Sequence, residues 1–298
     1  PERQFAFVAT ADHLLAVVDV SQKTMPVIEG ELDRPGTNDA VAVDLTRGVA
    51  AVAAGSDGLH LVDVSNLMTP SLRQTVDLDH GAGRLATFDG AAYVASGSAV
   101  VAVDLLTGEI LQSLDLQNGN INDIAREGPR LFTVDDQREL SIIDLTVDGM
   151  VQRGSNTLDG SDGNRGRIFV GDGLALVTVT DGFGEGFRGA FMTVDVSDPD
   201  SPVTLSGSDA GPQETLPNTE VVANGSGLAI AVGTPFATNN HQLRPFDISD
   251  PLDTNAPVAA PILLDAAPEG LDVAAGFGFV ANGADGLAIV NYLQLDTL

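Results

Sequence analysis

The chain has no cysteine and no tryptophan, and lysine occurs only once among its 14 basic residues. Without cysteine the chain can form neither disulfide bonds nor thiolate metal sites. No apolar run reaches the length of about 20 residues that a membrane-spanning helix needs, so we expect no direct membrane insertion. Hydrophobic residues nevertheless make up 43% of the chain and charged residues only 19%, which is enough apolar material to bury a core.

Positive charge is scarce, and the formal net charge of the chain is -28. Such a surface repels the phosphates of nucleic acids and anionic lipids, so we expect no nucleic acid among the partners. The same surface keeps a protein hydrated where salt screens the interactions between charges. We therefore expect a protein adapted to high salt, with an ordinary acidic secreted protein as the alternative.

One short pattern recurs along the chain, an apolar run that ends in Asp. It occurs seven times, with Asn in the last copy, and the runs end at Asp19, Asp63, Asp104, Asp144, Asp195, Asp247 and Asn291. The copies are about 40 residues apart and about 50 apart before the fifth and sixth. Two further apolar runs of strand length precede most copies, and a polar turn and another run follow, without helical periodicity.

Several short strands in each repeat of this length are typical of a β-propeller. We name the strands of a repeat a, b, c and d in chain order, so that the recurring Asp ends strand c. The sequence predicts an all-β fold, a single domain over residues 1–298 that forms a seven-bladed β-propeller of four-stranded antiparallel blades. The first repeat has no strand a and the last has no turn before its tail, so we expect an incomplete end blade or closure by residues 293–298.

The repeats resemble the LVIVD repeat, a unit that forms β-propellers. The resemblance is carried by Gly55-Ser-Asp-Gly-Leu-His-Leu-Val-Asp-Val-Ser65, Val194-Asp-Val-Ser-Asp-Pro-Asp-Ser-Pro202, Phe246-Asp-Ile-Ser-Asp-Pro251 and Gly283-Ala-Asp-Gly-Leu-Ala-Ile-Val290. It covers essentially the whole chain and implies the propeller fold. For function, it implies only that such proteins are mostly secreted or on the surface of bacteria and archaea. Residues 103–108 depart from it and resemble the Asp-x-x-Thr-Gly turn of quinoprotein-like propellers.

The recurring Asp is predicted to be structural. A carboxylate at the end of strand c can accept N–H bonds from the turn that leads to strand d. Asn291 is consistent with this role, because its amide oxygen can accept the same bonds.

Two b–c loops are enlarged and belong to adjacent repeats, residues 180–189 and 233–242. In a propeller the b–c loops gather on one face, and enlarged loops on a rigid scaffold commonly bind partners. We predict a surface for a protein or glycan here, with phenylalanine anchors, although these rings can instead fold back on their own blades. The candidate residues are Asp181, Phe183, Glu185, Phe187, Arg188, Phe236, Asn239, Asn240 and His241.

Two smaller sites are possible in the same part of the chain. Asp181 and Glu185, with glycine carbonyls between them, are a candidate calcium site, although the spacing is not that of an EF-hand. An ordinary Asp-Gly turn is the alternative. Asn224-Gly-Ser226 is a candidate glycosylation acceptor if the protein is exported, and an ordinary Asn-Gly turn explains it equally.

A third set of polar residues stands at the start of strand a, at the predicted channel mouth: Asp39, Arg84, Asp123, Arg167, Glu220 and Glu269. Both signs of charge are present, which suits mutual pairing or a polar ligand better than a metal cage. The four histidines occupy unlike repeat positions, and His60 is expected to be a packing residue. No P-loop, dinucleotide fingerprint or Gly-x-Ser-x-Gly elbow is present.

These features favour a non-catalytic β-propeller, extracellular or on a cell surface, that binds a protein or a glycan. No cofactor is expected beyond the candidate calcium ion. Two alternatives remain open. One is a lactonase-like or other metal-assisted hydrolase with an ion at the channel mouth. The other is a structural subunit of a larger surface assembly or virion.

Overall fold

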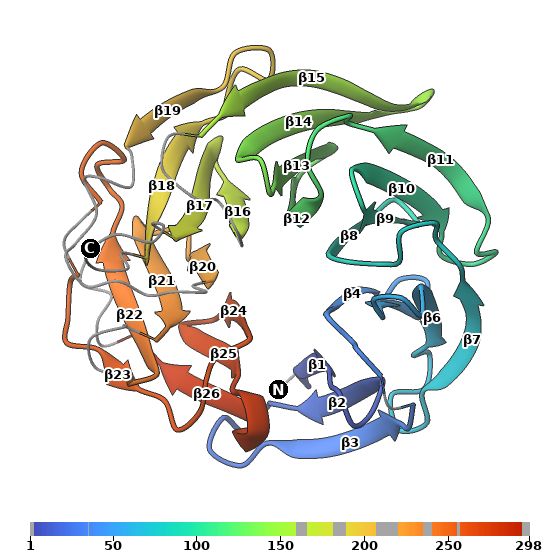
Figure 1. Ribbon diagram of the computed structural model, residues 1–298. Coiled ribbons are helices and arrows are strands. Elements are labelled where there is room, and N and C mark those ends of the chain that lie inside the picture. The colour runs from blue at the N-terminus through green and yellow to red at the C-terminus, as the bar shows by residue number, and fades with distance from the viewer. Residues whose placement is uncertain are drawn as a thin grey trace. The chain divides into compact units, whose positions relative to one another are not determined.

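The computed structural model describes residues 3–34, 36–158, 166–180, 189–206, 220–234, 240–254 and 257–293. Within these ranges the chain forms strands, and its one helical element is the 3-10 turn η2 at Gly283–Asp285. The strands pair into seven antiparallel sheets that follow one another along the chain, as the colours of Figure 1 run from blue to red. The expected fold class is confirmed: the chain is an all-β, seven-bladed β-propeller. The described part holds no helix with the length and apolar character needed to cross a membrane.

Each sheet follows the strand order a, b, c, d, so neighbours in sequence are neighbours in the sheet. The a strands are β4 (Ala40–Asp44), β8 (Leu85–Phe88), β12 (Ile121–Glu127), β16 (Ile168–Gly171), β20 (Glu220–Ala223) and β24 (Gly270–Ala274). The b strands are β1 (Phe5–Ala9), β5 (Val49–Ala53), β9 (Ala91–Ser96), β13 (Arg130–Asp135), β17 (Leu174–Thr180), β21 (Leu228–Gly233) and β25 (Phe277–Ala281). The c strands are β2 (Leu15–Asp19), β6 (Leu59–Asp63), β10 (Ala99–Asp104), β14 (Glu139–Thr146), β18 (Gly189–Asp195), β22 (Gln242–Asp247) and β26 (Leu287–Asn291). The d strands are β3 (Val27–Leu32), β7 (Ser71–Val76), β11 (Ile110–Asp115), β15 (Gly149–Thr157), β19 (Val203–Ser206) and β23 (Ile262–Leu263).

The two end sheets have three strands each in the described part of the chain. In the described ranges the first, β1-β2-β3, has no strand a and the last, β24-β25-β26, has no strand d, as expected from the sequence. Residues 294–298, which we expected to take part in closure, lie outside the described residues. How the end sheets are completed stays a prediction.

The chain divides into two compact units. The first runs to Ile124 and includes Thr146–Met150, and the second comprises Ala125–Leu145 and the chain from Val151 onward. The first unit holds the sheets β1–β3, β4–β7 and β8–β11. The second holds β16–β19, β20–β23 and β24–β26, and the strands of the sheet β12–β15 are shared between the units. The single domain stays a prediction.

Strands b and c are covered on both faces in the sheets between the first and the last, whereas β1 and β26 of the end sheets are half-buried. In β6, Leu59 and Leu61 pack into a cluster with the sheet β8–β11, whereas Val62 packs into a cluster with the sheet β1–β3. All five residues of β5 are buried. Because neighbouring sheets cover both faces, these strands consist of continuous apolar runs without polar alternation.

A β-bulge recurs between strands c and d. The register shifts at Val17/Val18, Leu61/Val62, Ala102/Val103 and Thr193/Val194, which leaves one extra residue in the d strand: Glu29, Arg73, Leu111 and Leu205. A bulge re-aims the side chain of the extra residue. Arg73 is such an extra residue, and its side chain donates to Asp63 at the end of strand c, with 3.1 Å between Nη2 and Oδ2.

The turn between strands c and d packs against the d strand of the preceding sheet. A Cβ atom on Gly30 would lie 2.3 Å from the carbonyl oxygen of Leu67. The same contact occurs in the second unit, where the N–H of Gly154 donates to the carbonyl of Pro199 at 2.8 Å. Glycine is needed at both positions because the two backbones approach too closely for any side chain.

Candidate functional site

The recurring residue at the end of strand c holds the turn that follows it. In six of the seven copies its Oδ1 atom accepts the backbone N–H two residues later. The donors are Ser21 (2.8 Å), Ser65 (2.9 Å), Leu106 (2.9 Å), Ser197 (3.0 Å), Ser249 (2.9 Å) and Leu293 (3.0 Å). The predicted structural role is therefore confirmed for all copies except Asp144.

These hydrogen bonds favour the ionised carboxylate. Bonds from Ser21 and then Arg3 lower the pKa of Asp19 to about 2. The pKa values of the equivalent carboxyls are also lowered, chiefly by bonds from their own turns, at Asp63, Asp104, Asp195 and Asp247. The ionised carboxylates therefore stabilise their own c–d turns.

Acid should destabilise the first of these turns, which Asp19 holds, by protonating its carboxylate. The pKa of Asp19 in the fold, about 2, lies below the ordinary value, so its ionised form stabilises the fold above about pH 4. That contribution is lost as the pH falls towards 2. We expect an NMR titration of the Asp19 carboxyl with a midpoint near 2, and Asp19→Asn should remove this part of the acid sensitivity. A midpoint near the ordinary value of about 4 would contradict the assignment.

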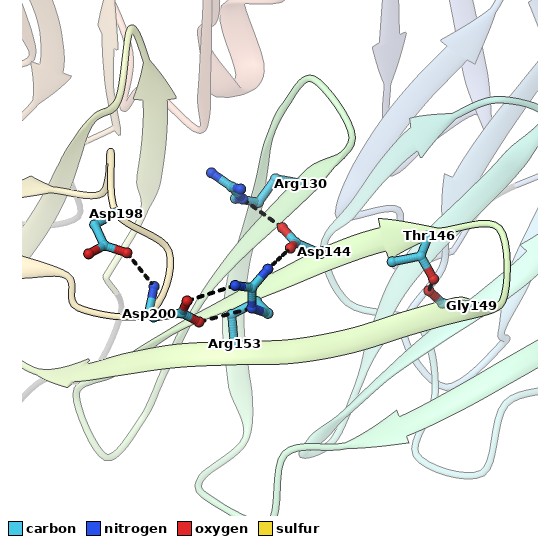
Figure 2. A network of polar contacts seen from close by, with 7 residues as sticks. All are labelled: Arg130, Asp144, Thr146, Gly149, Arg153, Asp198 and Asp200. Carbon is cyan, nitrogen blue, oxygen red and sulfur yellow. Dashed lines mark hydrogen bonds and ion pairs between the residues drawn. The ribbon is translucent and has the colours of Figure 1, made fainter.

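Asp144 departs from the pattern. Strand β14 continues past it to Thr146, so no turn begins where its carboxylate could accept turn N–H groups. Instead, Arg130 Nε donates to its Oδ1 at 2.7 Å and Arg153 pairs with its Oδ2 (Figure 2). Arg153 also reaches Asp200, in the next c–d turn, with 2.7 Å between Nη2 and Oδ2. Burial works to raise the pKa of Asp144, but the two arginines outweigh it and hold that pKa below its usual range.

Most of the residues predicted to line the channel mouth form backbone hydrogen bonds with strand b of their own sheets. Asp39 and Glu269 donate their N–H groups to the carbonyls of Ala53 and Ala281, at 2.9 and 2.8 Å. The Arg84 carbonyl accepts the N–H of Ala95 at 2.8 Å. These bonds explain why the positions recur, because each one begins the a–b pairing of a sheet.

The remaining mouth residues also make structural contacts. The N–H of Arg167 donates to Thr178 Oγ1 at 2.7 Å, and Glu220 Oε2 accepts the N–H of Leu271 at 3.0 Å. Asp123 is buried within β12. The described residues contain no group of three or more His, Asp or Glu placed to hold a metal ion. The hydrolase alternative stays a prediction.

Two histidines illustrate different environments. His60 is buried, its Nδ1 lies 2.8 Å from Thr75 Oγ1, and burial lowers its pKa. It is the packing residue we expected. His13 pairs on the surface with Asp33, which raises the pKa of the imidazole.

Most of the predicted loop-face residues lie outside the described residues: Asp181, Phe183, Glu185, Phe187, Arg188, Phe236 and Asn239. The candidate calcium ligands are among them. Asn240 is exposed, and His241 Nδ1 lies 2.7 Å from Thr234 Oγ1, across the base of its loop. His241 therefore closes the base of this loop.

The two enlarged loops leave two sheets that pack against each other. Thr180 pairs with Gly189 where the first loop leaves β17 and enters β18, and Gly233 pairs with Gln242 where the second leaves β21. Between the two sheets, the ring of Phe191, two residues from the first loop base, meets the ring of Phe246, at the far end of β22, edge to face with centroids 5.4 Å apart. These rings belong to one buried cluster shared by the two sheets, with Leu176, Val221, Ala229, Ala231 and Ile248.

Two polar residues near the second loop were not predicted from the sequence. Gln242 and Arg244 alternate with Phe246 along β22 and therefore share its face, and both are buried. The Gln242 Nε2 atom has no hydrogen-bond partner among the described residues. A polar residue inside an otherwise apolar strand run was the signal that could have marked them.

Asn224 lies in the turn between β20 and β21. Its Oδ1 accepts the N–H and the hydroxyl of Ser226, at 3.0 and 2.8 Å. This is the ordinary Asx turn that the sequence allowed. Glycosylation at Asn224 stays a prediction.

Comparisons with known proteins agree with this architecture. The LVIVD repeat family matches residues 3–33 and 39–78, which span the first two sheets. No curated protein matches the chain in sequence. Similar solved structures include a protein from Lactobacillus plantarum (11% identity, TM-score 0.73, covering 95% of this chain and 90% of that one). They also include Kuenenia stuttgartiensis hydrazine synthase (13%, 0.65, 93% and 89%) and a chain of the mitotic checkpoint complex (12%, 0.72, 96% and 83%). At these identities the likeness shows the fold alone.

Proposed function

We propose that this LVIVD-repeat β-propeller is a non-catalytic interaction module that binds another protein through the two enlarged b–c loops, residues 180–189 and 233–242. The observation that carries the proposal is the packing of the two sheets that carry the loops. Both loops leave the b–c ends of their sheets, and the two sheets pack on each other through one buried cluster in which the rings of Phe191 and Phe246 lie 5.4 Å apart. Loops that vary on a rigid scaffold are where binding surfaces commonly occur.

A protein fits this surface better than a small polar ligand. The loops carry Phe183, Phe187 and Phe236, and aromatic anchors supply much of the energy in protein interfaces. Elsewhere, the polar groups of the repeat are used within the fold, since the strand-c carboxylates hold turns. The presence of a similarly folded chain in the mitotic checkpoint complex agrees with a role in protein assembly.

We also propose that the protein is located outside the cell or on its surface, in an environment of high salt. The net charge of -28 supports it, because such a chain repels itself strongly unless salt screens the charges. The resemblance to LVIVD repeats, which occur mostly in secreted and surface proteins, supports it as well.

Affinity capture with loop-shortened variants tests the binding surface. In one variant an Asn-Gly turn replaces residues 181–188 and a second Asn-Gly turn replaces residues 234–241, because a two-residue turn closes a hairpin without strain. A control variant changes Ser56-Asp57, in a b–c turn of the first unit, to Asn-Gly. Each immobilised chain is incubated with an extract of the source organism in about 2 M NaCl.

The native chain and the control should retain the same protein, and the double-loop variant should retain at least about tenfold less. An unchanged melting temperature would show that the shortened chain still folds. Recovery of the same protein in equal amount on the double-loop variant would contradict the proposal.

A further inference from the structure

Exposed large apolar side chains gather at one end of the sheets. We call the end with the a–b and c–d turns the turn end, and the end with the b–c loops the loop end. Among the described residues, the exposed large apolar side chains at the turn end are Met25, Val27, Ile28, Leu45, Met68, Leu106, Ile110, Leu111, Val147, Val151, Val203, Leu252 and Leu293. Leu263 alone of this described set lies at the loop end. Exposed apolar side chains that gather in one region mark an interaction site more often than single scattered ones do.

Five of these residues lie in the first two sheets, and we call them the turn-end patch: Met25, Val27, Ile28, Leu45 and Met68, between 56% and 67% exposed. Its members are brought together by the packing of turns. A Cβ atom on Gly30, in the middle of β3, would lie 3.0 Å from the carbonyl carbon of Met68. The a–b turn that contains Leu45 ends at Gly48, where a Cβ atom would lie 3.1 Å from Ser65 Cβ in the c–d turn.

Charge at this end of the two sheets is balanced. Of the residues that the structure describes, four basic ones, Arg3, Lys23, Arg47 and Arg73, stand there among four acidic ones, Asp19, Glu29, Asp44 and Asp63. The arginines pair with these acids within the chain: Arg47 Nη1 lies 2.8 Å from Asp44 Oδ2, and Arg3 bridges Asp19 and Glu29. The loop end of the same sheets has one basic residue, Arg34, against seven acids, Asp12, Glu31, Asp33, Asp39, Asp57, Asp77 and Asp79, a balance of -6.

We propose that the turn-end patch is the contact between two copies of this chain. A cationic partner would find these carboxylates already held by Arg3, Arg47 and Arg73. A second copy offers the same apolar side chains and the same neutral mixture of both signs, which is the self-complementarity that a two-fold interface requires. This contact would also leave the acidic loop ends of the first two sheets outside the interface.

Salt should promote this association. Two chains of charge -28 repel each other at long range, and the Debye length shortens from about 10 Å at 0.1 M to about 3 Å at 1 M salt. Screening removes the repulsion but leaves the apolar contact in place. An interface held by ion pairs would weaken under the same change, so the direction of the salt effect distinguishes the two.

Sedimentation velocity on the native chain and two matched variants tests the proposal. In about 2 M NaCl we expect a dimer, and in about 0.1 M NaCl a monomer. Met68→Glu places a charge in the patch and should raise the dissociation constant in high salt at least about tenfold. Leu263→Glu is the control, because Leu263 and Met68 are both 65% exposed but Leu263 lies at the loop end of β23.

Retention of the dimer by Leu263→Glu and by the conservative Met68→Leu would support the patch. A native chain that stays monomeric at both salt concentrations would overturn the proposal and assign the patch to a different partner. Equal weakening by Met68→Glu and Leu263→Glu would overturn it as well. Melting temperatures of the variants confirm that each one is folded.

Discussion

Replacing Phe132 with alanine is expected to lower the free energy of unfolding by about 4 kcal/mol. Phe132 lies in β13 and is only 1% exposed. Its ring belongs to a buried cluster that includes Ile142 of the same sheet and Val177 of the next. Alanine removes the buried ring and leaves a cavity that two packed sheets cannot close without moving apart. Urea denaturation of the purified chain measures the effect.

Leu252→Ala is the matched control, because this apolar side chain is exposed in a c–d turn. Its removal should change the free energy of unfolding by no more than about 0.5 kcal/mol. A loss for Phe132→Ala as small as that for Leu252→Ala would show that the sheets are not packed through this cluster.

Gly30→Val should cost about 3 kcal/mol, although the residue carries no side chain of its own. The new Cβ atom would lie 2.3 Å from the carbonyl oxygen of Leu67. The obstacle is backbone, and that turn is held by its own bonds, since Asn66 Oδ1 accepts the N–H of Met68 at 3.1 Å. The substitution must therefore move either β3 or the c–d turn of the neighbouring sheet.

Gly36→Ala serves as its control. There the nearest heavy atom to an added Cβ would be Asp57 Oδ2 at 3.6 Å, an ordinary contact. We expect a change within about 1 kcal/mol, of either sign, because alanine also reduces the freedom of the unfolded chain. If Gly30→Val proved as mild as Gly36→Ala in urea denaturation, the close approach of the two backbones would be wrong.

The strands were predictable because burial on both faces leaves a simple mark in the sequence. Runs such as Leu15–Asp19 contain apolar residues at every position but one, and they recur at intervals of about 40 to 50 residues. The terminal Asp was predictable for a local reason, since its partner N–H lies two residues away. Features that depend on near neighbours in the sequence could thus be derived from the sequence alone.

Features that depend on a neighbouring strand or a neighbouring sheet could not. Nothing in the sequence around Arg73 marks it as the extra residue of a bulge, because the shift exists only relative to β6. Gly30 gives no sign that Leu67 lies over it. Asp144 looked like the other copies, and only the extension of β14 to Thr146 shows why its carboxylate pairs with arginines instead.

The same limit applies to the binding surfaces. The enlarged loops could be found from their length, but the support shared through Phe191 and Phe246 is a contact between sheets. The turn-end patch was missed because Met25 and Met68 read like any other apolar residues in the sequence. Their exposure follows from where the turns end, which periodicity does not record.

Hydrogen–deuterium exchange of the chain, free and with its captured protein partner, tests the interaction role most directly. We predict slower exchange on binding in peptides that cover residues 180–189 and 233–242. Slower exchange confined to the starts of the a strands, around Asp123 and Glu220, with no change in the two loops, would contradict the account and place the ligand at the predicted channel mouth instead.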